Sequence, residues 1–274
     1  MHDESKNNIN KNHHRCWICG AEADSAEHRI KKSDLVRAYG RGPYRGDTAP
    51  LHFHGNNQSV VQGSNARTAK YDRSLCHRCN TTFTQPFDQA YNLFMEWIMA
   101  NERQVLQKRF VNFVDVYGEQ FEVCQRNLYK YFAKSFGCRL VDAGYEVPTD
   151  VIELLRLTYF QTALLITLAV NEDILILPSV DRDGFIGKGD LCALAERSDP
   201  TRVTGYTWNE HISWFTVCYW YGCPPDGDFW STWIANSQHV YLGSYQPLTP
   251  EMRKEAAQKA RARVATLGSS KNNT

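Results

Sequence analysis

Apolar residues recur at helical spacing in the middle of the chain. After Pro86, positions 87, 91, 94, 95, 98, 105 and 106 are apolar, mainly at intervals of three or four residues, which predicts a long helix over 86–106 with one apolar face. Three more segments predict helices: 122–136, which ends at Gly137, then 148–170, and finally 250–267. Segment 110–117 fits a helix and a strand equally well.

The second half of the chain alternates between short apolar runs and turn residues. The ranges 174–177, 203–208, 211–221, 229–235 and 239–242 are rich in β-branched and aromatic residues and are separated by Gly, Pro and Asp. This pattern predicts a small antiparallel sheet. Five of the seven tryptophans fall in this region. Core packing is the favoured interpretation of that cluster, and stacking on bases or on a partner is the alternative.

Length and composition are those of a globular protein. The chain has 274 residues, of which 42% are hydrophobic and 22% charged, so it can bury a core without disulfides. We expect an α+β fold with an N-terminal module at 13–90, followed over 91–267 by a helical layer and a small antiparallel sheet that select a target or partner. The ends, 1–12 and 268–274, are expected to be disordered tails.

No segment predicts a membrane span or a secretory signal. The longest apolar stretch, 151–170, contains Glu153, Arg156 and Gln161, which is typical of a buried helix and not of a bilayer span. The first fifteen residues are polar and lack an apolar core. We therefore expect a cytoplasmic protein with reduced cysteines.

Basic residues are concentrated in one segment. Residues 28–82 contain ten Lys and Arg against three Asp, whereas the whole chain has a net charge of +1. A basic segment on a nearly neutral protein is typical of a surface that contacts a phosphate backbone, and a solvated basic face is the alternative. The candidate DNA-binding residues are Arg29, Lys31, Lys32, Arg37, Arg41, Arg45, Arg67, Arg73 and Arg78.

Four of the nine cysteines form two C-x-x-C pairs, Cys16 with Cys19 and Cys76 with Cys79. The two-residue spacer lets both thiolates of a pair turn toward one metal ion, and two pairs complete the tetrahedral shell that Zn²⁺ prefers. The spacing therefore predicts a structural zinc site. The other five cysteines lack such spacing and are expected to be core residues.

Residues suited to hydrolytic chemistry lie beside these pairs. Glu27 and His28 follow the first pair, and Asn80 comes directly after the second. Phosphodiester hydrolysis needs a base that activates water and a hard cation that stabilises charge on the phosphate. His28 suits the first role because its pKa lies near neutrality. The side-chain oxygens of Glu27 and Asn80 are ligands that Mg²⁺ prefers.

This order of residues resembles the HNH, or ββα-metal, endonucleases, and most of all their zinc-stapled branch, which includes the phage resolvase endonuclease VII. The resemblance covers about residues 13–90. It implies that His28 is the general base and that Glu27 and Asn80 hold a catalytic Mg²⁺ or Mn²⁺. It also implies a structural zinc on Cys16, Cys19, Cys76 and Cys79. The chain departs from the family pattern at Glu27, where many members have Asp, and in the long span between His28 and Cys76.

That long span contains five glycines and the pair Asn56-Asn57, which predicts an irregular loop that wraps a groove of the duplex with its arginines. The residue that orients His28 is expected within it. Asn65 is the candidate, with His52 and His54 as alternatives.

Together these features predict a Mg²⁺- or Mn²⁺-dependent DNA endonuclease. The alternative is a zinc-dependent nucleic-acid-binding or scaffold protein with a vestigial nuclease site. Chains with HNH modules resemble restriction, anti-phage and mobile-element proteins, so a role in defence and a protein partner encoded nearby are expected from that resemblance alone. One HNH module makes one cut, so a double-strand break would imply a homodimer.

Overall fold

The computed structural model describes residues 15–46, 49–54, 57–157, 161–178, 182–225 and 231–270. For 51–54, 57–58 and 262–270 the description concerns the backbone alone. The predicted tail at 1–12 and residues 271–274 lie outside this range.

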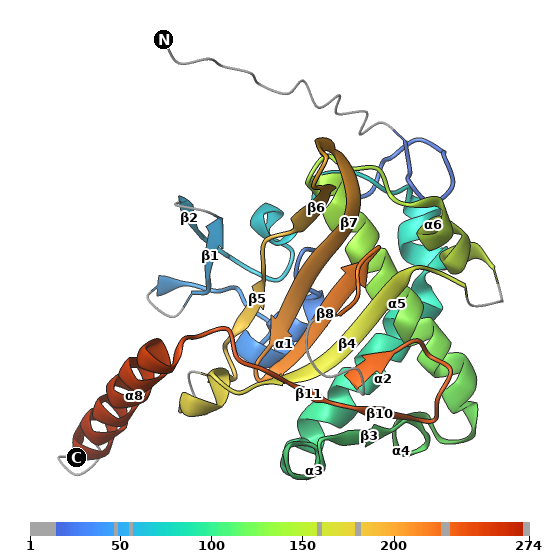
Figure 1. The fold of residues 1–274 in the computed structure, drawn as a ribbon. Coiled ribbons are helices and arrows are strands. Elements are labelled where there is room, and N and C mark those ends of the chain that lie inside the picture. Colours follow the sequence, from blue (N-terminus) through green and yellow to red (C-terminus); the bar gives the residue numbers. More distant parts are fainter. Residues whose placement is uncertain are drawn as a thin grey trace.

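A mostly antiparallel sheet forms the centre of the fold (Figure 1). Its described strands are β4 (Leu164–Asn171), β5 (Ile186–Lys188), β6 (Cys192–Glu196), β7 (Asp199–Ile212), β8 (Phe215–Tyr221), β9 (Thr232–Trp233) and β11 (Gly243–Tyr245). They run in the order β11-β4-β8-β7-β5, with β6 beside β7 and β9 beside β4, and β11 is parallel to β4. The predicted α+β class and the predicted antiparallel sheet are confirmed.

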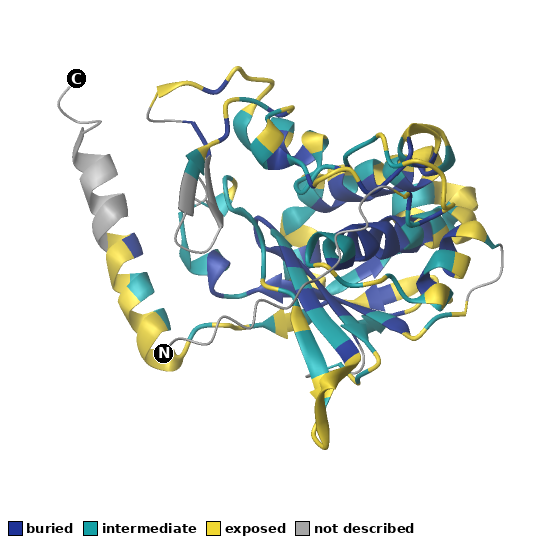
Figure 2. Ribbon diagram, turned by 90° about the horizontal axis from the view of Figure 1, so that it is seen from above, coloured by how far each residue is buried: buried dark blue, intermediate teal, exposed yellow. Residues whose placement is uncertain are grey.

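Helices cover one face of this sheet. α2 (Gln85–Ala100) and α5 (Phe121–Asp142) pack against each other, and the chain between them forms α3 (Glu102–Lys108), β3 (Phe110–Asn112), α4 (Phe113–Tyr117) and η4 (Gly118–Gln120). α6 (Thr149–Arg156) lies against α5 and leads into β4. Figure 2 shows that buried residues gather where the helices meet the sheet.

Side chains of the strands alternate between the two faces of the sheet. On β8, the ring of Phe215 lies 5.7 Å from that of Phe94 on α2, and the ring of Tyr219 stacks on Phe136 of α5 at 5.9 Å. These aromatic contacts are the core packing favoured from the sequence. Trp220, next along the strand, points to the opposite face, because neighbouring residues of a strand alternate.

The N-terminal part of the chain packs on α5 and α2. Antiparallel bridges pair Ser25 with Leu75 and His28 with Lys70. Between the two paired segments lie α1 (Lys32–Tyr39), the hairpin of β1 (Leu51–His54) and β2 (Asn57–Val60), and η2 (Arg67–Ala69). After them, η3 (Arg78–Phe83) leads into α2. The insert is therefore more regular than the irregular loop that the sequence predicts.

The C-terminal segment returns along the sheet and ends in a helix. β10 (His239–Tyr241) pairs with β3, and α8 (Pro250–Ser270) then projects away from the sheet (Figure 1). This helix continues through Gly268 to Ser270, so the predicted tail at 268–274 begins within α8. No helix in the described part of the chain combines the length and the apolarity that crossing a bilayer requires.

Several predicted elements differ from those observed. Segment 148–170 is not one helix: α6 ends at Arg156, and 164–171 form β4, which pairs with β8, β9 and β11. A strand that is paired on both sides and has little exposed surface carries apolar residues at nearly every position. Its sequence therefore shows no period of two. The predicted strand at 174–177 is instead the short helix η5 (Ile174–Ile176).

Other boundaries shift without changing the architecture. The predicted helix 86–106 is divided at Asn101 between α2 and α3, and segment 110–117 forms both a strand and a helix, β3 and α4. The ranges 203–208 and 211–221 become the long strands β7 and β8. Within 229–235, residues 229 and 230 lie outside the description and Thr232–Trp233 form β9.

α5 also runs past Gly137, where the sequence predicts that it ends. A Cβ atom added at Gly137 would lie 2.6 Å from Cη2 of Trp17, so the absent side chain makes room for the indole. The glycine therefore marks a close contact between α5 and the first cysteine pair, and not a helix end.

Gly137→Ala is expected to destabilise the protein by roughly 1–3 kcal/mol, because the new methyl group overlaps Trp17, even though alanine is the better helix former. Urea unfolding of the metal-loaded protein measures the change. Gly63→Ala is the matched control: nothing lies within 4 Å of a Cβ there, so its effect should stay within about 0.5 kcal/mol. A Gly137→Ala protein as stable as the wild type would contradict this account.

Candidate functional site

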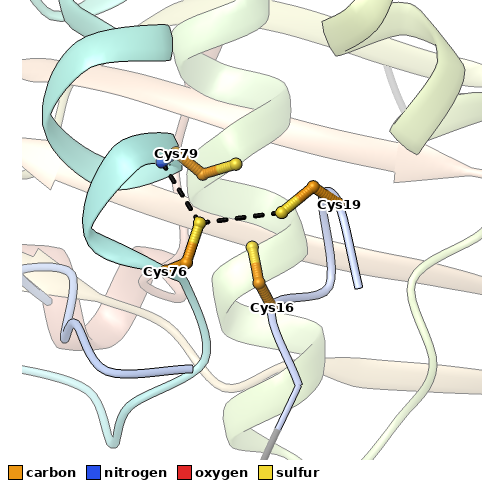
Figure 3. Close-up of side chains that lie close together, drawn as sticks. All are labelled: Cys16, Cys19, Cys76 and Cys79. Atoms are coloured by element: carbon orange, nitrogen blue, oxygen red, sulfur yellow. Dashed lines mark hydrogen bonds between the residues drawn. The ribbon is translucent and has the colours of Figure 1, made fainter. Parts of the chain in front are cut away.

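The side chains of Cys16, Cys19, Cys76 and Cys79 point toward one another (Figure 3). All four sulfur atoms lie within 4.8 Å of one another, and the Sγ atoms of Cys19 and Cys76 are 3.6 Å apart. A tetrahedral zinc with Zn–S bonds of about 2.3 Å requires sulfur atoms about 3.8 Å apart. The arrangement is therefore compatible with a structural zinc, as the spacing in the sequence predicts.

Backbone hydrogen bonds shape both cysteine pairs. The amide of Gly20 donates to the carbonyl of Cys16 at 2.7 Å, and Gly20 has a φ of 78°, a left-handed conformation that suits glycine. In the second pair, the amide of Cys79 donates to Sγ of Cys76 at 3.4 Å. Asp24 joins the two pairs, since its carboxylate accepts from the amide of His77 at 2.6 Å.

The environment of the thiols favours a bound cation. Burial raises the pKa of Cys16 and of Cys79, whereas a hydrogen bond from the backbone of Ala21 lowers the pKa of Cys19. Four adjacent thiolates in a partly buried space repel one another unless a divalent ion compensates their charge. The donor set is that of structural zinc sites.

A short antiparallel pair of segments leads from the cysteine cluster to the predicted catalytic residues. The amide of Ser25 donates to the carbonyl of Leu75 at 2.9 Å, and the amide of Tyr71 donates to the carbonyl of Glu27 at 2.9 Å. Farther along, the amide of Arg29 donates to the carbonyl of Ala69 at 2.7 Å. The two segments are joined by isolated bridges and are not regular strands, and η3 and α2 follow the second of them.

Asn80 lies against the first of these segments. Its Nδ2 donates to Oγ of Ser25 at 2.9 Å and to the carbonyl of Ala26 at 3.3 Å. Its Oδ1 is buried and has no hydrogen-bond partner among the described residues. The structure thus brings Asn80 to the residues that immediately precede Glu27 and His28.

Glu27 is buried and already has two partners. Its Oε1 accepts from the backbone amide of His28 at 2.8 Å, and its Oε2 lies 2.6 Å from Nζ of Lys134 on α5. The side chain of Lys134 is 1% exposed, and its Nζ also contacts Oγ1 of Thr84 at 3.3 Å and Oδ1 of Asp88 at 3.4 Å. A cationic group of the protein therefore lies directly beside the predicted metal-binding carboxylate.

The pair is ionised at neutral pH. Burial opposes the charge on Glu27, but Lys134 and then Lys31 outweigh it and hold the pKa of Glu27 below its usual value. Burial likewise opposes the charge on Lys134, yet Glu27 and Asp88 raise its pKa. Neither group gives up its charge near pH 7.

His28 is neutral in this environment. Burial lowers its pKa, and the positive charge of Lys70 and Lys31 adds to that effect, while Glu27 acts in the opposite direction. Its Nε2 is buried and has no hydrogen-bond partner among the described residues. A neutral imidazole is the form that accepts a proton.

Asn65 lies elsewhere in the insert. It is exposed and lines a hollow of about 560 Å³ together with Arg41, Arg67 and Thr68. No hydrogen bond joins Asn65 to His28 in the described structure. The alternatives His52 and His54 belong to β1, and their side chains are outside the description.

The predicted DNA-binding residues fall into two groups. Three have acidic partners near the site: Arg29 makes two bonds of 2.7 Å to Asp142, Lys31 binds Asp88, and Arg37 binds Asp34 at 2.5 Å. The other six, Lys32, Arg41, Arg45, Arg67, Arg73 and Arg78, are all exposed, and among them Arg67 binds Asp72 at 2.6 Å. The second group is the one available to a phosphate backbone.

Sequence reasoning missed Lys134. From the sequence alone, Asp88 could extend the site, but a role at the N-terminus of its own helix is favoured. Asp88 does lie in the first turn of α2, but it also binds Lys31 and Lys134. The one signal for Lys134 was a lysine within the apolar run of Tyr131, Phe132 and Phe136. No protein-family model, curated protein or solved structure matches the chain.

Cys76→Ser is expected to release the metal and to unfold the N-terminal part, because zinc binding supplies folding free energy and the cysteine cluster belongs to the main core. The purified wild type should contain one zinc per chain by elemental analysis, and the variant almost none. Cys192→Ser, at an exposed cysteine outside the cluster, is the control. Full stability of a zinc-free Cys76→Ser protein would disprove the role of the cluster.

Lys134→Met is expected to lower the free energy of unfolding by about 3–5 kcal/mol, because it leaves the carboxylate of Glu27 buried without its cation. The double variant Glu27→Gln with Lys134→Met removes both charges and should recover most of that loss. Urea unfolding measures both, and Arg126→Met, at an exposed position of α5, is the control. Equal losses in the single and double variants would rule out the ion pair as the cause.

Proposed function

We propose that this chain is a metal-dependent endonuclease of the HNH kind that hydrolyses DNA phosphodiester bonds. The observation that carries the proposal is the position of Asn80. The second cysteine pair holds its amide against the segment that leads into Glu27 and His28, and its Oδ1 is buried without a hydrogen-bond partner among the described residues. The helix that follows the two bridged segments around these residues supports the same assignment.

The oxygen donors fit a hard divalent cation. Oδ1 of Asn80 is a buried acceptor that no described group satisfies. Each carboxylate oxygen of Glu27 accepts one hydrogen bond, which leaves lone pairs on both. Glu27 and Asn80 would therefore hold Mg²⁺ or Mn²⁺, which stabilises negative charge on a phosphate that is being cleaved.

The other residues of the site have separate roles in this proposal. His28, neutral at pH 7, accepts the proton of the attacking water. Lys134 keeps Glu27 ionised and fixed in place. The exposed arginines of the insert contact the DNA backbone. Arg41 and Arg67 line a hollow together with Thr68. Thr68 is two residues before Lys70, the bridge partner of His28, so the hollow is close in sequence to the site.

A specific observation favours a second candidate function. The ammonium group of Lys134 already neutralises Glu27 at 2.6 Å, so the carboxylate is satisfied without a second metal ion. In that case the chain is a zinc-dependent nucleic-acid-binding or scaffold protein whose nuclease site is vestigial. The two candidates differ in one measurable property, which is cleavage.

Purified, zinc-loaded protein is expected to nick supercoiled plasmid in the presence of Mg²⁺ or Mn²⁺ and to stop when EDTA is added. His28→Ala and Asn80→Ala should each slow cleavage by about 10²–10⁴-fold, because they remove the base and a cation ligand. Agarose gels measure the rate, and elemental analysis verifies that zinc is retained.

His77→Ala is the matched control, because His77 lies beside the same cysteine pair but is exposed. It should cleave at the wild-type rate. Unchanged cleavage by His28→Ala would reject His28 as the base. A wild-type protein that binds DNA and holds zinc but never cleaves with either ion would support the second candidate.

A further inference from the structure

A cavity of about 480 Å³ opens on the face of the sheet opposite the helices. We call it the sheet-face cavity. On β4, Ile166 and Leu168 are fully buried, and the residues that alternate with them, Thr167 and Ala169, line the cavity. Helices lie on the other side of the sheet in Figure 1. The cavity and the candidate nuclease site therefore do not share a surface.

The cavity exists because small side chains lie between large ones. Its lining includes Thr167, Ala169, Cys218 and Gly243, with the aromatic rings of Trp220 and Tyr245. Residues that share a face of a strand are about 6.8 Å apart. A small residue between bulky neighbours therefore leaves an open slot on that face of the sheet.

Hydrogen bonds fix the two aromatic side chains. Nε1 of Trp220 donates to Oγ1 of Thr167 at 3.1 Å, and the hydroxyl of Tyr245 accepts from Nδ2 of Asn209 at 3.0 Å. Oδ1 of Asn209 is bonded in turn to Nε2 of His211 at 3.0 Å. The rings are thus held rigidly, which favours stacking because little side-chain entropy is lost on binding.

These same bonds limit what else the cavity can recognise. Both polar atoms of the Asn209 side chain and the hydroxyl of Thr167 are already engaged, so few groups remain to bind a molecule rich in hydroxyls. Burial lowers the pKa of His211 to about 4, so this residue adds no positive charge at pH 7. Recognition by stacking is left as the main source of affinity.

The charge of the lining points to a ligand without phosphate. Among the described residues that line the cavity, no Lys or Arg is present, and the one charged side chain is the exposed carboxylate of Asp190. Asp190 has no hydrogen-bond or ion-pair partner among them. A carboxylate accepts hydrogen bonds from exocyclic amino groups, as it does in recognition of base edges, whereas the ring N–H of uracil lies between two carbonyl oxygens that repel a carboxylate.

We propose that the sheet-face cavity binds an uncharged planar heteroaromatic compound of the nucleoside class, with its base against Trp220 and Tyr245. The base carries an exocyclic amino group that donates to Asp190. Guanosine, adenosine and cytidine meet this requirement, and uridine does not. The site is independent of the proposed nuclease activity, because none of the residues assigned to that activity lines the cavity.

The test is a titration of the full-length, zinc-loaded protein with guanosine, adenosine, cytidine and uridine, followed by tryptophan fluorescence and calorimetry. At least one amino-bearing nucleoside should bind saturably with a Kd below about 1 mM and more tightly than uridine. Trp220→Leu should weaken that binding at least tenfold. Trp97→Leu, at a half-buried tryptophan on α2, should leave it unchanged. Asp190→Ala, which removes the acceptor, should abolish the preference over uridine.

In a second variant, Ala169→Leu, a larger side chain fills part of the cavity while Trp220 is kept. This variant should also weaken binding at least tenfold. Circular dichroism and zinc content verify that each variant folds. Three results would overturn the proposal: no saturable binding of any nucleoside, binding unaffected by both cavity variants, or tighter binding of glucose or of a nucleoside triphosphate than of the nucleosides.

Discussion

The ion pair between Lys134 and Glu27 is the interaction on which the rest of the structure depends. Burying two opposite charges is unfavourable unless each finds its partner and further hydrogen bonds. Here the ammonium group has Glu27, Asp88 and the hydroxyl of Thr84 around it. The pair fixes α5 against the segment that carries His28, and it determines both the charge and the position of the carboxylate in the candidate site.

Other contacts extend this connection across the predicted boundary near residue 90. Arg29 binds Asp142 at the end of α5, and its guanidinium lies 4.6 Å from the ring centroid of Tyr71. Lys188 of β5 contacts Tyr71 at 3.5 Å and Glu210 of β7 at 3.0 Å. The N-terminal part is therefore held by buried and half-buried polar groups of the helices and the sheet, and the candidate site contains residues of both.

Local spacing was sufficient to predict the cysteine cluster, because two residues between thiols determine how a pair folds. The α+β class also follows from periodicity. The strand 164–171 could not be separated from a helix, since its pairing with β8 involves residues about fifty positions away. Lys134 could not be assigned to the site for the same reason. Its partner Glu27 lies 107 residues earlier, and a buried ion pair has no local sequence pattern.

The contact between Trp17 and Gly137 has a consequence for how the chain is made. During synthesis the first cysteine pair leaves the ribosome early, but its indole has no surface to pack on until residue 137 and the rest of α5 have been made. The first cysteine pair therefore reaches its final packing only after a residue 120 positions beyond Trp17 has been added to the chain.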